Sequence, residues 1–275
     1  MDFELAKKRV DELTTILNDC IEKYYMGNES DVSDYDYDMM MRELSELEDK
    51  FPELLKTNSP THRVGGQADG LFETVVHTVK MESLQDVFNF DELRTFGEKI
   101  DISNTVFSVE PKIDGLSVSL EYRDGLFFRG STRGDGETGE DVTANLMQIK
   151  SIPKAIKFEG EHCVRGEVYM SHESFDELVE KQELKGEKTF KNPRNAAAGS
   201  VRQKDSKITK ERNLDIFIFN IQQISDEYKL TSHKQSLDLL KEFGFKVSPR
   251  YNVYDNIEDV IKEIEEIGNM RGNFS

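Results

Sequence analysis

The chain has 275 residues with two cysteines, and its 54 acidic against 36 basic residues give a formal net charge of −18. This length suggests roughly two domains, two cysteines are too few for a disulfide framework, and no apolar run approaches the ~18 residues of a membrane span. A chain this acidic repels phosphate backbones, which argues against tight duplex binding by this chain alone. The start has no apolar signal region, so a reducing compartment is expected.

The charge is distributed unevenly along the chain. Residues 1–66 carry a net charge of −8, whereas residues 181–212 carry +6. A basic run of this kind is either a solvated surface or a local anion site. The composition leaves both interpretations open.

The first 56 residues predict two helices. Apolar residues from Val10 to Tyr24 recur three and four positions apart, which is typical of one helical stripe. Gly27-Asn28 interrupts the pattern, and Ser33 with Asp36 fits a capping box that begins a second helix. We therefore expect a helical hairpin in a module spanning 1–66, followed by a second domain spanning 67–275.

The second domain predicts strands mixed with helices. Strands are expected at 106–109, 116–122, 126–128, 163–170 and, as a buried apolar strand, 214–221; helical stretches are expected at 142–149, from about Ser171, around 237–243 and around 260–267. A turn at Arg123-Asp124-Gly125 predicts a hairpin. Hairpins beside helices indicate an α+β class with mixed, largely antiparallel sheets. No G-x-G-x-x-G follows a strand, so a Rossmann fold is not supported.

The most informative motif is Glu110-Pro111-Lys112-Ile113-Asp114-Gly115, a lysine flanked by carboxylates in a strand-to-strand connection. One interpretation is a turn with a solvated lysine, and the other is a nucleophilic amine. A lysine side chain has an ordinary pKa of about 10.4, so burial or a nearby cation must favour the neutral form before it can attack. Because carboxylates act in the opposite direction, a metal or an arginine is expected near Lys112.

Three further motifs carry charged groups that suit a phosphate or a sugar. Arg133 lies in a Gly-rich loop over 131–141, which is either a mobile acidic loop or a backbone-lined pocket. Arg165 and Glu167 share one face of a predicted strand, facing either solvent or a cleft. Arg194 and Arg202 are eight residues apart and would share one face of a helix. Such a combination is what phosphoryl or nucleotidyl transfer requires.

The chain resembles the N-terminal part of bacterial NAD-dependent DNA ligases over essentially its whole length. The resemblance depends on Ser59-Pro60-Thr61, Arg63-Val64-Gly65-Gly66, Glu110-Pro111-Lys112-Ile113-Asp114-Gly115, Thr132-Arg133-Gly134-Asp135-Gly136, Thr138-Gly139-Glu140-Asp141, Val164-Arg165-Gly166-Glu167-Val168 and the run from Asn192-Pro193-Arg194-Asn195 through Ala196-Ala197-Ala198-Gly199-Ser200-Val201-Arg202-Gln203. Each motif alone could be chance, but their order and spacing together are highly specific.

The resemblance implies a helical module for the nicotinamide mononucleotide half of NAD and a nucleotidyltransferase domain, with the ATP-grasp-like catalytic fold of ligases and capping enzymes. It implies that a lysine takes AMP from NAD with Mg²⁺ assisting, releases nicotinamide mononucleotide, and passes AMP to the 5′-phosphate of a DNA nick in replication and repair. A bacterial cytoplasmic location and a monomer are expected, with no membrane partner.

Carried over residue by residue, Lys112 matches the nucleophile and Asp114 the carboxylate near the metal or the lysine. Glu110 matches the residue beside adenine, and Phe219 the stacking aromatic, although a core strand position explains Phe219 equally well. The remaining matches are Ser83 and Leu84 at the adenosine, Arg133 and Glu167 at the ribose and phosphate, and Arg194 and Arg202 at the phosphates. No residue is assigned as a metal ligand.

The helical module supplies the residues expected around the nicotinamide half: Tyr24, Tyr25, Asp34, Tyr35, Asp36, Tyr37 and Asp38. A helical stripe and a capped helix start explain some of them equally well. Tyr25 stands where relatives can carry His, and Glu82 where Leu is common. The departure at Tyr25 alters a hydrogen bond rather than the stacking.

The last residues printed, 270–275, fall before the strands of the same domain that carry a metal-associated acid and a lysine in the family. The family's oligonucleotide-binding fold, zinc finger and helix-hairpin-helix repeats follow later, so zinc is expected only there. This chain by itself is expected to form lysyl-AMP weakly or not at all, to bind nicked DNA weakly, and not to seal nicks. An ATP- or GTP-dependent relative and a non-catalytic nucleotide-binding module are the alternatives.

Overall fold

The computed structural model describes residues 3–25, 32–56, 59–62, 72–100 and 104–270, which form two compact units. Unit 1 comprises 1–83 with 133–140, and unit 2 comprises 84–132 with 141–275. The break at Gly27-Asn28, the expected boundary after residue 66 and the residues after Met270 lie outside the described residues. The boundary at residue 66 therefore stays a prediction.

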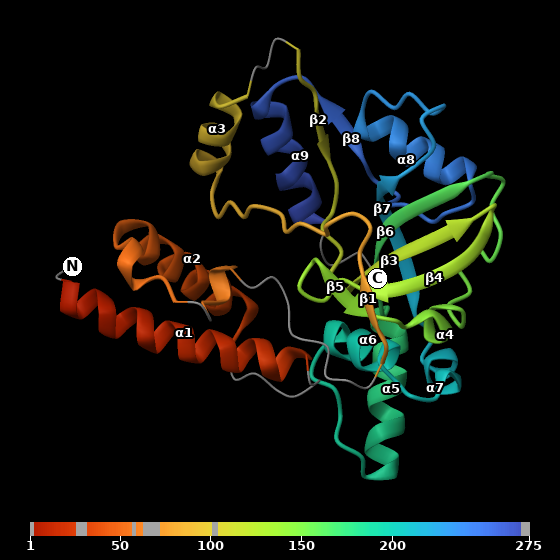
Figure 1. Cartoon of the computed structure of the whole chain (residues 1–275), viewed down its shortest axis with the longest axis horizontal. Coiled ribbons are helices and arrows are strands. Elements are labelled where there is room, and N and C mark those ends of the chain that lie inside the picture. Colours follow the sequence, from red (N-terminus) through yellow and green to blue (C-terminus); the bar gives the residue numbers. More distant parts are fainter. Residues whose placement is uncertain (1–2, 26–31, 57–58, 63–71, 101–103, 271–275) are drawn as a thin grey trace. The chain divides into compact units, whose positions relative to one another are not determined.

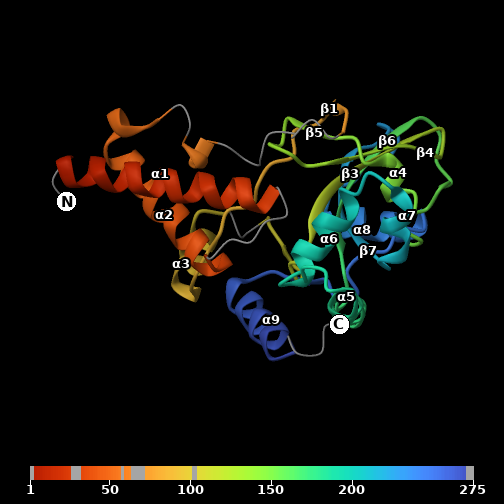
Figure 2. The same ribbon diagram turned by 90° about the horizontal axis from the view of Figure 1, so that it is seen from below.

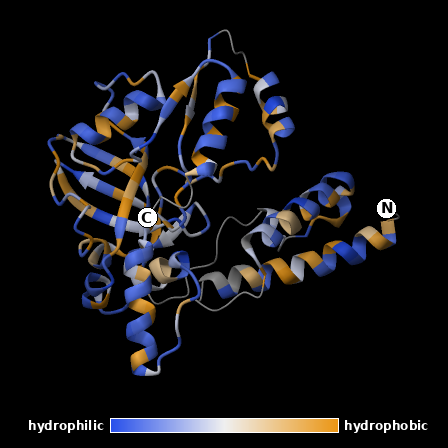
Figure 3. Ribbon diagram, turned by 180° about the vertical axis from the view of Figure 1, so that it is seen from behind, coloured by the Kyte–Doolittle hydropathy of each residue, from blue (hydrophilic) through white to orange (hydrophobic). Residues whose placement is uncertain are grey.

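Unit 1 contains the helical hairpin expected from the sequence, formed by α1 (Phe3–Tyr25) and α2 (Asp34–Lys50). Apolar and polar residues alternate along α1 (Figure 3), and its apolar positions form a buried core with α2 that comprises Ala6, Val10, Leu13, Leu17, Leu44 and Leu47. The short helices η1 (Pro52–Leu54) and η2 (Pro60–His62) follow α2. The Ser33 hydroxyl accepts from the Asp36 amide at 3.1 Å, so the predicted cap is confirmed.

A small two-stranded sheet completes unit 1. Strand β1 (Thr74–Val76) pairs antiparallel with β5 (Thr138–Glu140). The loop before β5 is held by Asp135, whose carboxylate accepts from the amides of Glu137 and Thr138 at 2.9 and 2.6 Å. Those amide bonds lower the pKa of Asp135, although burial acts in the opposite direction. The Gly-rich segment is thus a folded turn rather than a mobile acidic loop.

Unit 2 is built around a four-stranded antiparallel sheet in the order β4-β3-β6-β7 (Figure 1). Its strands are β3 (Leu116–Arg123), β4 (Leu126–Thr132), β6 (Glu161–Tyr169) and β7 (Asp215–Gln223). The hairpin turn between β3 and β4 has positive φ at Asp124 and Gly125, 47° and 76°, which is typical of a type I′ turn. The expected antiparallel hairpin is confirmed.

Strand β7 differs from the buried apolar strand that its sequence suggested. Ile216 and Ile218 are fully buried, whereas Phe217 and Phe219 are only half-buried. Side chains alternate between the two faces of a strand, and only one face of this sheet is the core. The aromatic side chains of β7 therefore belong to the opposite, polar face.

Five helices accompany the sheet: α4 (Thr143–Leu146), α5 (His172–Lys185), α6 (Pro193–Val201), α7 (Ser206–Glu211) and α8 (His233–Glu242). Helix α4 packs on β4, α6 on β3 and β6, and α8 on β7 (Figure 2). The helix expected over 142–149 is shorter than predicted, because turns follow Leu146. The core beneath α8 is aromatic, with Tyr122, Phe243 and Phe245 around the buried His162.

A second layer of unit 2 comprises β2 (Phe107–Val109) paired with β8 (Asn252–Tyr254), and the helices α9 (Ile257–Asn269) and α3 (Phe90–Glu98). Helix α9 packs on both strands and on α3. A buried carboxylate, Glu263, joins α9 to β8 by accepting from Arg250, Asn252 and Tyr254. These bonds lower the pKa of Glu263 to about 2, with Arg250 the largest cause.

Candidate functional site

The polar face of the four-stranded sheet carries the candidate site. The register of β3 and β6 places Ser117 opposite Glu167 and Ser119 opposite Arg165. Val118 and Val168 are fully buried, so they mark the core face. Because strand side chains alternate, Ser117, Arg165 and Glu167 lie on the other face. The prediction that Arg165 and Glu167 share a face is confirmed.

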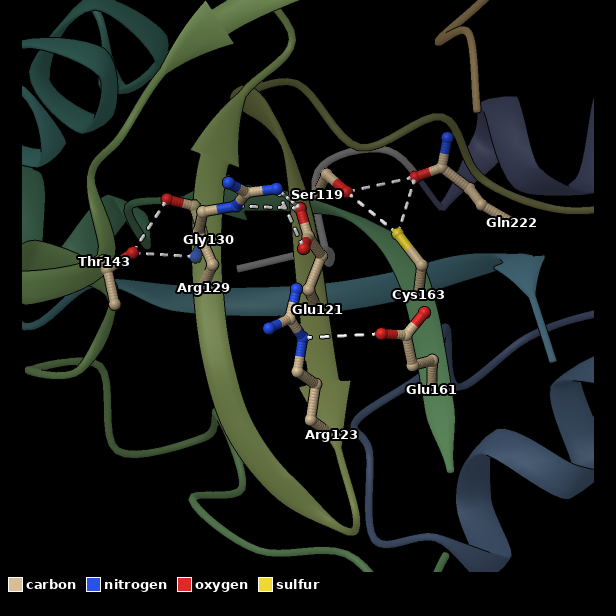
Figure 4. Close-up of polar contacts among 9 residues, drawn as sticks. All are labelled: Ser119, Glu121, Arg123, Arg129, Gly130, Thr143, Glu161, Cys163 and Gln222. Atoms are coloured by element: carbon tan, nitrogen blue, oxygen red, sulfur yellow. Dashed lines mark hydrogen bonds and ion pairs between the residues drawn. The ribbon is translucent and has the colours of Figure 1, made fainter. Parts of the chain in front are cut away.

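One end of this polar face is filled by its own contacts (Figure 4). Arg129 donates to both carboxylate oxygens of Glu121, at 2.8 and 3.0 Å, across β4 and β3. The hydroxyl of Ser119 lies 3.1 Å from the Cys163 sulfur and donates to Gln222 at 3.3 Å. Burial raises the pKa of the Cys163 thiol to about 11, so the thiol stays protonated and is no nucleophile at neutral pH. The predicted site residues lie toward the other end.

The segment that carries Lys112 connects β2 to β3 and runs against β6. Gly115 is buried there, and a Cβ atom at that position would lie 2.1 Å from the carbonyl oxygen of Val168. Only glycine allows this close backbone approach. The approach fixes the position from which Lys112 and Asp114 leave the sheet, and both side chains are exposed.

An arginine lies next to this segment, as the chemistry of a lysine between carboxylates requires. The Arg194 Nε atom is 3.3 Å from Oδ1 of Asp114, and Arg194 is about one-third exposed. The arginine therefore offsets the charge of one of the two carboxylates that flank Lys112. A nearby negative charge favours the protonated amine, so offsetting that charge favours the neutral amine that can act as a nucleophile.

Glu167 has a strongly shifted pKa in this region. Burial raises its pKa to about 7, against the opposing positive charges of Lys112, Arg194 and Arg165. The nearby charge of Asp114 adds to the rise. These interactions place Lys112, Asp114, Glu167 and Arg194 in one cluster, brought together from three separate sequence motifs. A carboxyl group that titrates near neutrality beside cations is typical of a functional site.

Helix α6 positions Arg194 at its first turn. The Asn192 side chain caps the helix by accepting from the Asn195 amide at 2.8 Å, and Pro193 occupies the first turn. The alanines at 196–198 are buried. Arg202 is the C-cap residue and is half-buried with contacts of its own. The structure therefore places the two arginines at opposite ends of α6.

The carboxylate of Glu110 lies where β2 ends. Its Oε1 atom accepts from the Ser108 hydroxyl at 3.0 Å and lies 2.8 Å from Nε2 of His233. Ser108 belongs to β2, whereas His233 is the first residue of α8. The sequence contained no signal for His233, because the partner lies more than a hundred positions away in the chain.

Phe219 lies at a bulge of β7, where the pairing with β6 shifts between Arg165 and Gly166. The Arg165 guanidinium is 5.4 Å from the centre of the Phe219 ring and donates to Ser117 at 3.1 Å. The neighbouring Phe217 instead stacks parallel on Tyr169 with the ring centres 5.1 Å apart. Phe219 is therefore half-buried beside polar groups.

The predicted residues of unit 1 have varied surroundings. The side chains of Tyr24, Tyr25 and Asp34 lie outside the described residues. Asp36 contacts its own cap, Ser33, at 2.7 Å. Tyr35 is exposed, Tyr37 packs on the helical core, and Asp38 is half-buried. Among the other matches, Ser83 and Arg133 belong to unit 1 and the exposed Leu84 to unit 2. Their assignments stay predictions.

The described residues contain no group of three or more His, Cys, Asp or Glu side chains that could hold a metal ion. Mg²⁺ keeps several waters and binds through one or two carboxylates together with substrate phosphates. A protein-only metal cage is therefore not formed by the described residues. In the described part of the chain, no helix is long and apolar enough to cross a membrane.

Comparison with known families identifies both parts of the chain. A family profile described as "NAD-dependent DNA ligase adenylation domain" matches residues 69–275. A second profile, described as "DNA ligase-like, N-terminal NAD+-binding domain", matches residues 4–65. The two profiles together match residues 4–65 and 69–275.

Similar proteins are about half identical to this chain over the part of their sequence that aligns with it. A DNA ligase of Thermoanaerobacter sp. (strain X514) is 50% identical over 267 residues, which cover 96% of this chain and 40% of the relative. DNA ligases of Caldicellulosiruptor bescii and Clostridioides difficile are 50% and 46% identical, each over 98% of this chain and 40% of their own length. The chain thus spans about 40% of the length of these relatives.

Proposed function

The chain belongs to the family of NAD-dependent DNA ligases, and on this premise we propose that it carries out the adenylation step, with Lys112 taking the adenylyl group from NAD. The observation that supports this most is the cluster of Lys112, Asp114, Glu167 and Arg194, which joins three separate motifs in one place. Family membership sets aside the ATP- or GTP-dependent relative.

In the proposed step, the Lys112 amine must first lose one proton to water. Its lone pair then forms a bond to the phosphorus of the adenylyl group, and the bond from that phosphorus to the bridging pyrophosphate oxygen breaks. Nicotinamide mononucleotide leaves with the bonding electron pair, and the second amine proton passes to solvent. The product is a phosphoramide between Lys112 and AMP, with no change in oxidation state.

The surrounding residues orient the nucleotide in this proposal. Arg194 and Arg202 bind phosphate oxygens, for which a guanidinium fork is suited. Glu167 accepts a hydrogen bond from a ribose hydroxyl, Phe219 stacks on adenine, and Glu110 accepts from the base. Mg²⁺, when bound through the phosphates, would neutralise developing charge.

The remaining assignments follow from the resemblance. We propose that the module at 1–66 binds the nicotinamide half through the tyrosines and aspartates named above, and that 67–275 is the adenylation domain. Arg133, Ser83 and Leu84 would contact the adenylyl half. Nick sealing, zinc and most DNA contacts are proposed for the portion of the relatives that this chain does not span, in a monomeric cytoplasmic enzyme.

Ligand protection against thermal unfolding tests this proposal, because a ligand that binds only the folded state raises the melting temperature. NAD and nicotinamide mononucleotide are expected to raise it, and ATP is not. Arg194→Ala is expected to weaken protection by NAD more than protection by nicotinamide mononucleotide. Protection by ATP alone, or by none of the three, would contradict the proposed substrate.

A further inference from the structure

The carboxylate of Glu110 uses its two oxygens differently. The side chain is only 18% exposed, and Oε1 is held by both Ser108 and His233, at 3.0 and 2.8 Å. None of the described residues donates a hydrogen bond to Oε2. One oxygen is thus committed to the protein, and the other is available to a ligand.

The clamp on Oε1 comes from two independent elements. Ser108 is fixed within β2, where it pairs with Val253 of β8. His233 is fixed at the start of α8, whose cap is Ser232. Because a carboxylate oxygen is an acceptor, Nε2 of His233 carries the hydrogen, which holds for both the neutral Nε2–H tautomer and the imidazolium.

We propose that His233 and Ser108 are positioning residues that make Glu110 a selector for the 6-amino group of a purine. This inference rests on the proposed function, which places adenine beside Glu110. With Oε1 held at two points, the carboxylate cannot rotate freely, and Oε2 stays directed at one position of the base. The amino group of adenine donates to that oxygen.

The clamp explains selectivity and not merely affinity. Hypoxanthine and guanine carry an oxygen at position 6, so a fixed acceptor meets another acceptor there. Both bases also carry a donor, N1–H, at the neighbouring ring position. A carboxylate that could turn would accept from N1–H and bind them, whereas a clamped one cannot. Rejection by a fixed, unsatisfied polar contact is a strong form of discrimination.

Calorimetric titration of the chain with AMP and with IMP tests the inference, since neither nucleotide can be transferred. We expect wild type to bind AMP more tightly than IMP. His233→Ala and Ser108→Ala should each lower the AMP-to-IMP affinity ratio about 3- to 10-fold, the range of one net hydrogen bond. His233→Gln, which keeps a donor, should retain part of the ratio.

Lys234→Ala is the matched control, because the exposed Lys234 binds Asp238 and not Glu110. The AMP-to-IMP affinity ratio of this control variant should equal that of wild type. If the alanine variants bind AMP with an unchanged ratio, or lose AMP and IMP equally, the positioning role is wrong while the proposed function stands. If wild type binds no AMP, both are wrong. If a melting curve shows that His233→Ala does not fold, the affinity ratios of Ser108→Ala and His233→Gln decide the outcome.

Discussion

Replacing Gly115 by alanine tests how tightly the lysine segment is held against the sheet. The added Cβ atom would lie 2.1 Å from the Val168 carbonyl oxygen, well inside any ordinary contact. Backbone on one side of the β3–β6 pair must therefore move by about 1 Å. Overpacking of this kind costs about 1–3 kcal/mol, and disruption of the terminal ladder bonds adds about 1 kcal/mol. We expect a loss of about 3 kcal/mol in the free energy of unfolding.

Urea unfolding at neutral pH measures this loss, and NAD protection measures its effect on the site. Gly268→Ala is the control, because nothing lies within 4 Å of a Cβ atom at that position in α9, and alanine should stabilise the helix by up to about 1 kcal/mol. If Gly115→Ala unfolds within about 0.5 kcal/mol of wild type, in the range of a neutral surface substitution, then the segment is not packed as described.

Three further changes have defined outcomes. Because Glu167 has a folded pKa of about 7 against an ordinary 4.5, its stabilising contribution is complete below pH 4.5 and is lost as pH rises to about 7. Glu167→Gln should therefore have a higher free energy of unfolding than wild type at pH 8, by roughly 3 kcal/mol at most, and the difference should be smaller at pH 5. Equal differences at both pH values would contradict the burial of its charge. Glu263→Ala should lower the free energy of unfolding in urea by about 2–3 kcal/mol, because it leaves three hydrogen-bond donors unpaired. Glu266 is an exposed partner of Arg250, so Glu266→Ala should lower it by less than about 1 kcal/mol. Similar losses in the two variants would contradict the role of the buried carboxylate. Ser33→Ala should cost about 1 kcal/mol through loss of the α2 cap, with Ser33→Asp close to wild type in the same thermal melts.

Local patterns in the sequence were sufficient for most secondary structure. The helical stripe from Val10 onward, the cap at Ser33 and the turn at Asp124-Gly125 depend on short-range spacing, and the structure has all three. Strand β7 was misjudged because its apolar run does not reveal that only Ile216 and Ile218 face the core. The bulge at Phe219 was also not predictable, because pairing irregularities of this kind depend on the partner strand.

The site was predictable in its residue types but not in its contacts. A lysine between two carboxylates was expected to have a metal or an arginine nearby. Arg194 is that arginine, and it contacts the carboxylate of Asp114. The lysine itself is exposed rather than buried, and the buried ionisable group next to it is Glu167. His233 could not be found from the sequence, because its role depends on the placement of α8 next to the end of β2.

The central claim is that Lys112 receives the adenylyl group, and peptide mapping by mass spectrometry tests it most directly. The chain would be incubated for a long period with NAD and Mg²⁺, digested, and compared with Lys112→Ala treated in the same way. We predict a low-yield adduct of one adenylyl group on the peptide that contains Lys112 and its absence from the variant. An adduct on a different residue, or one that persists in Lys112→Ala, would contradict the account.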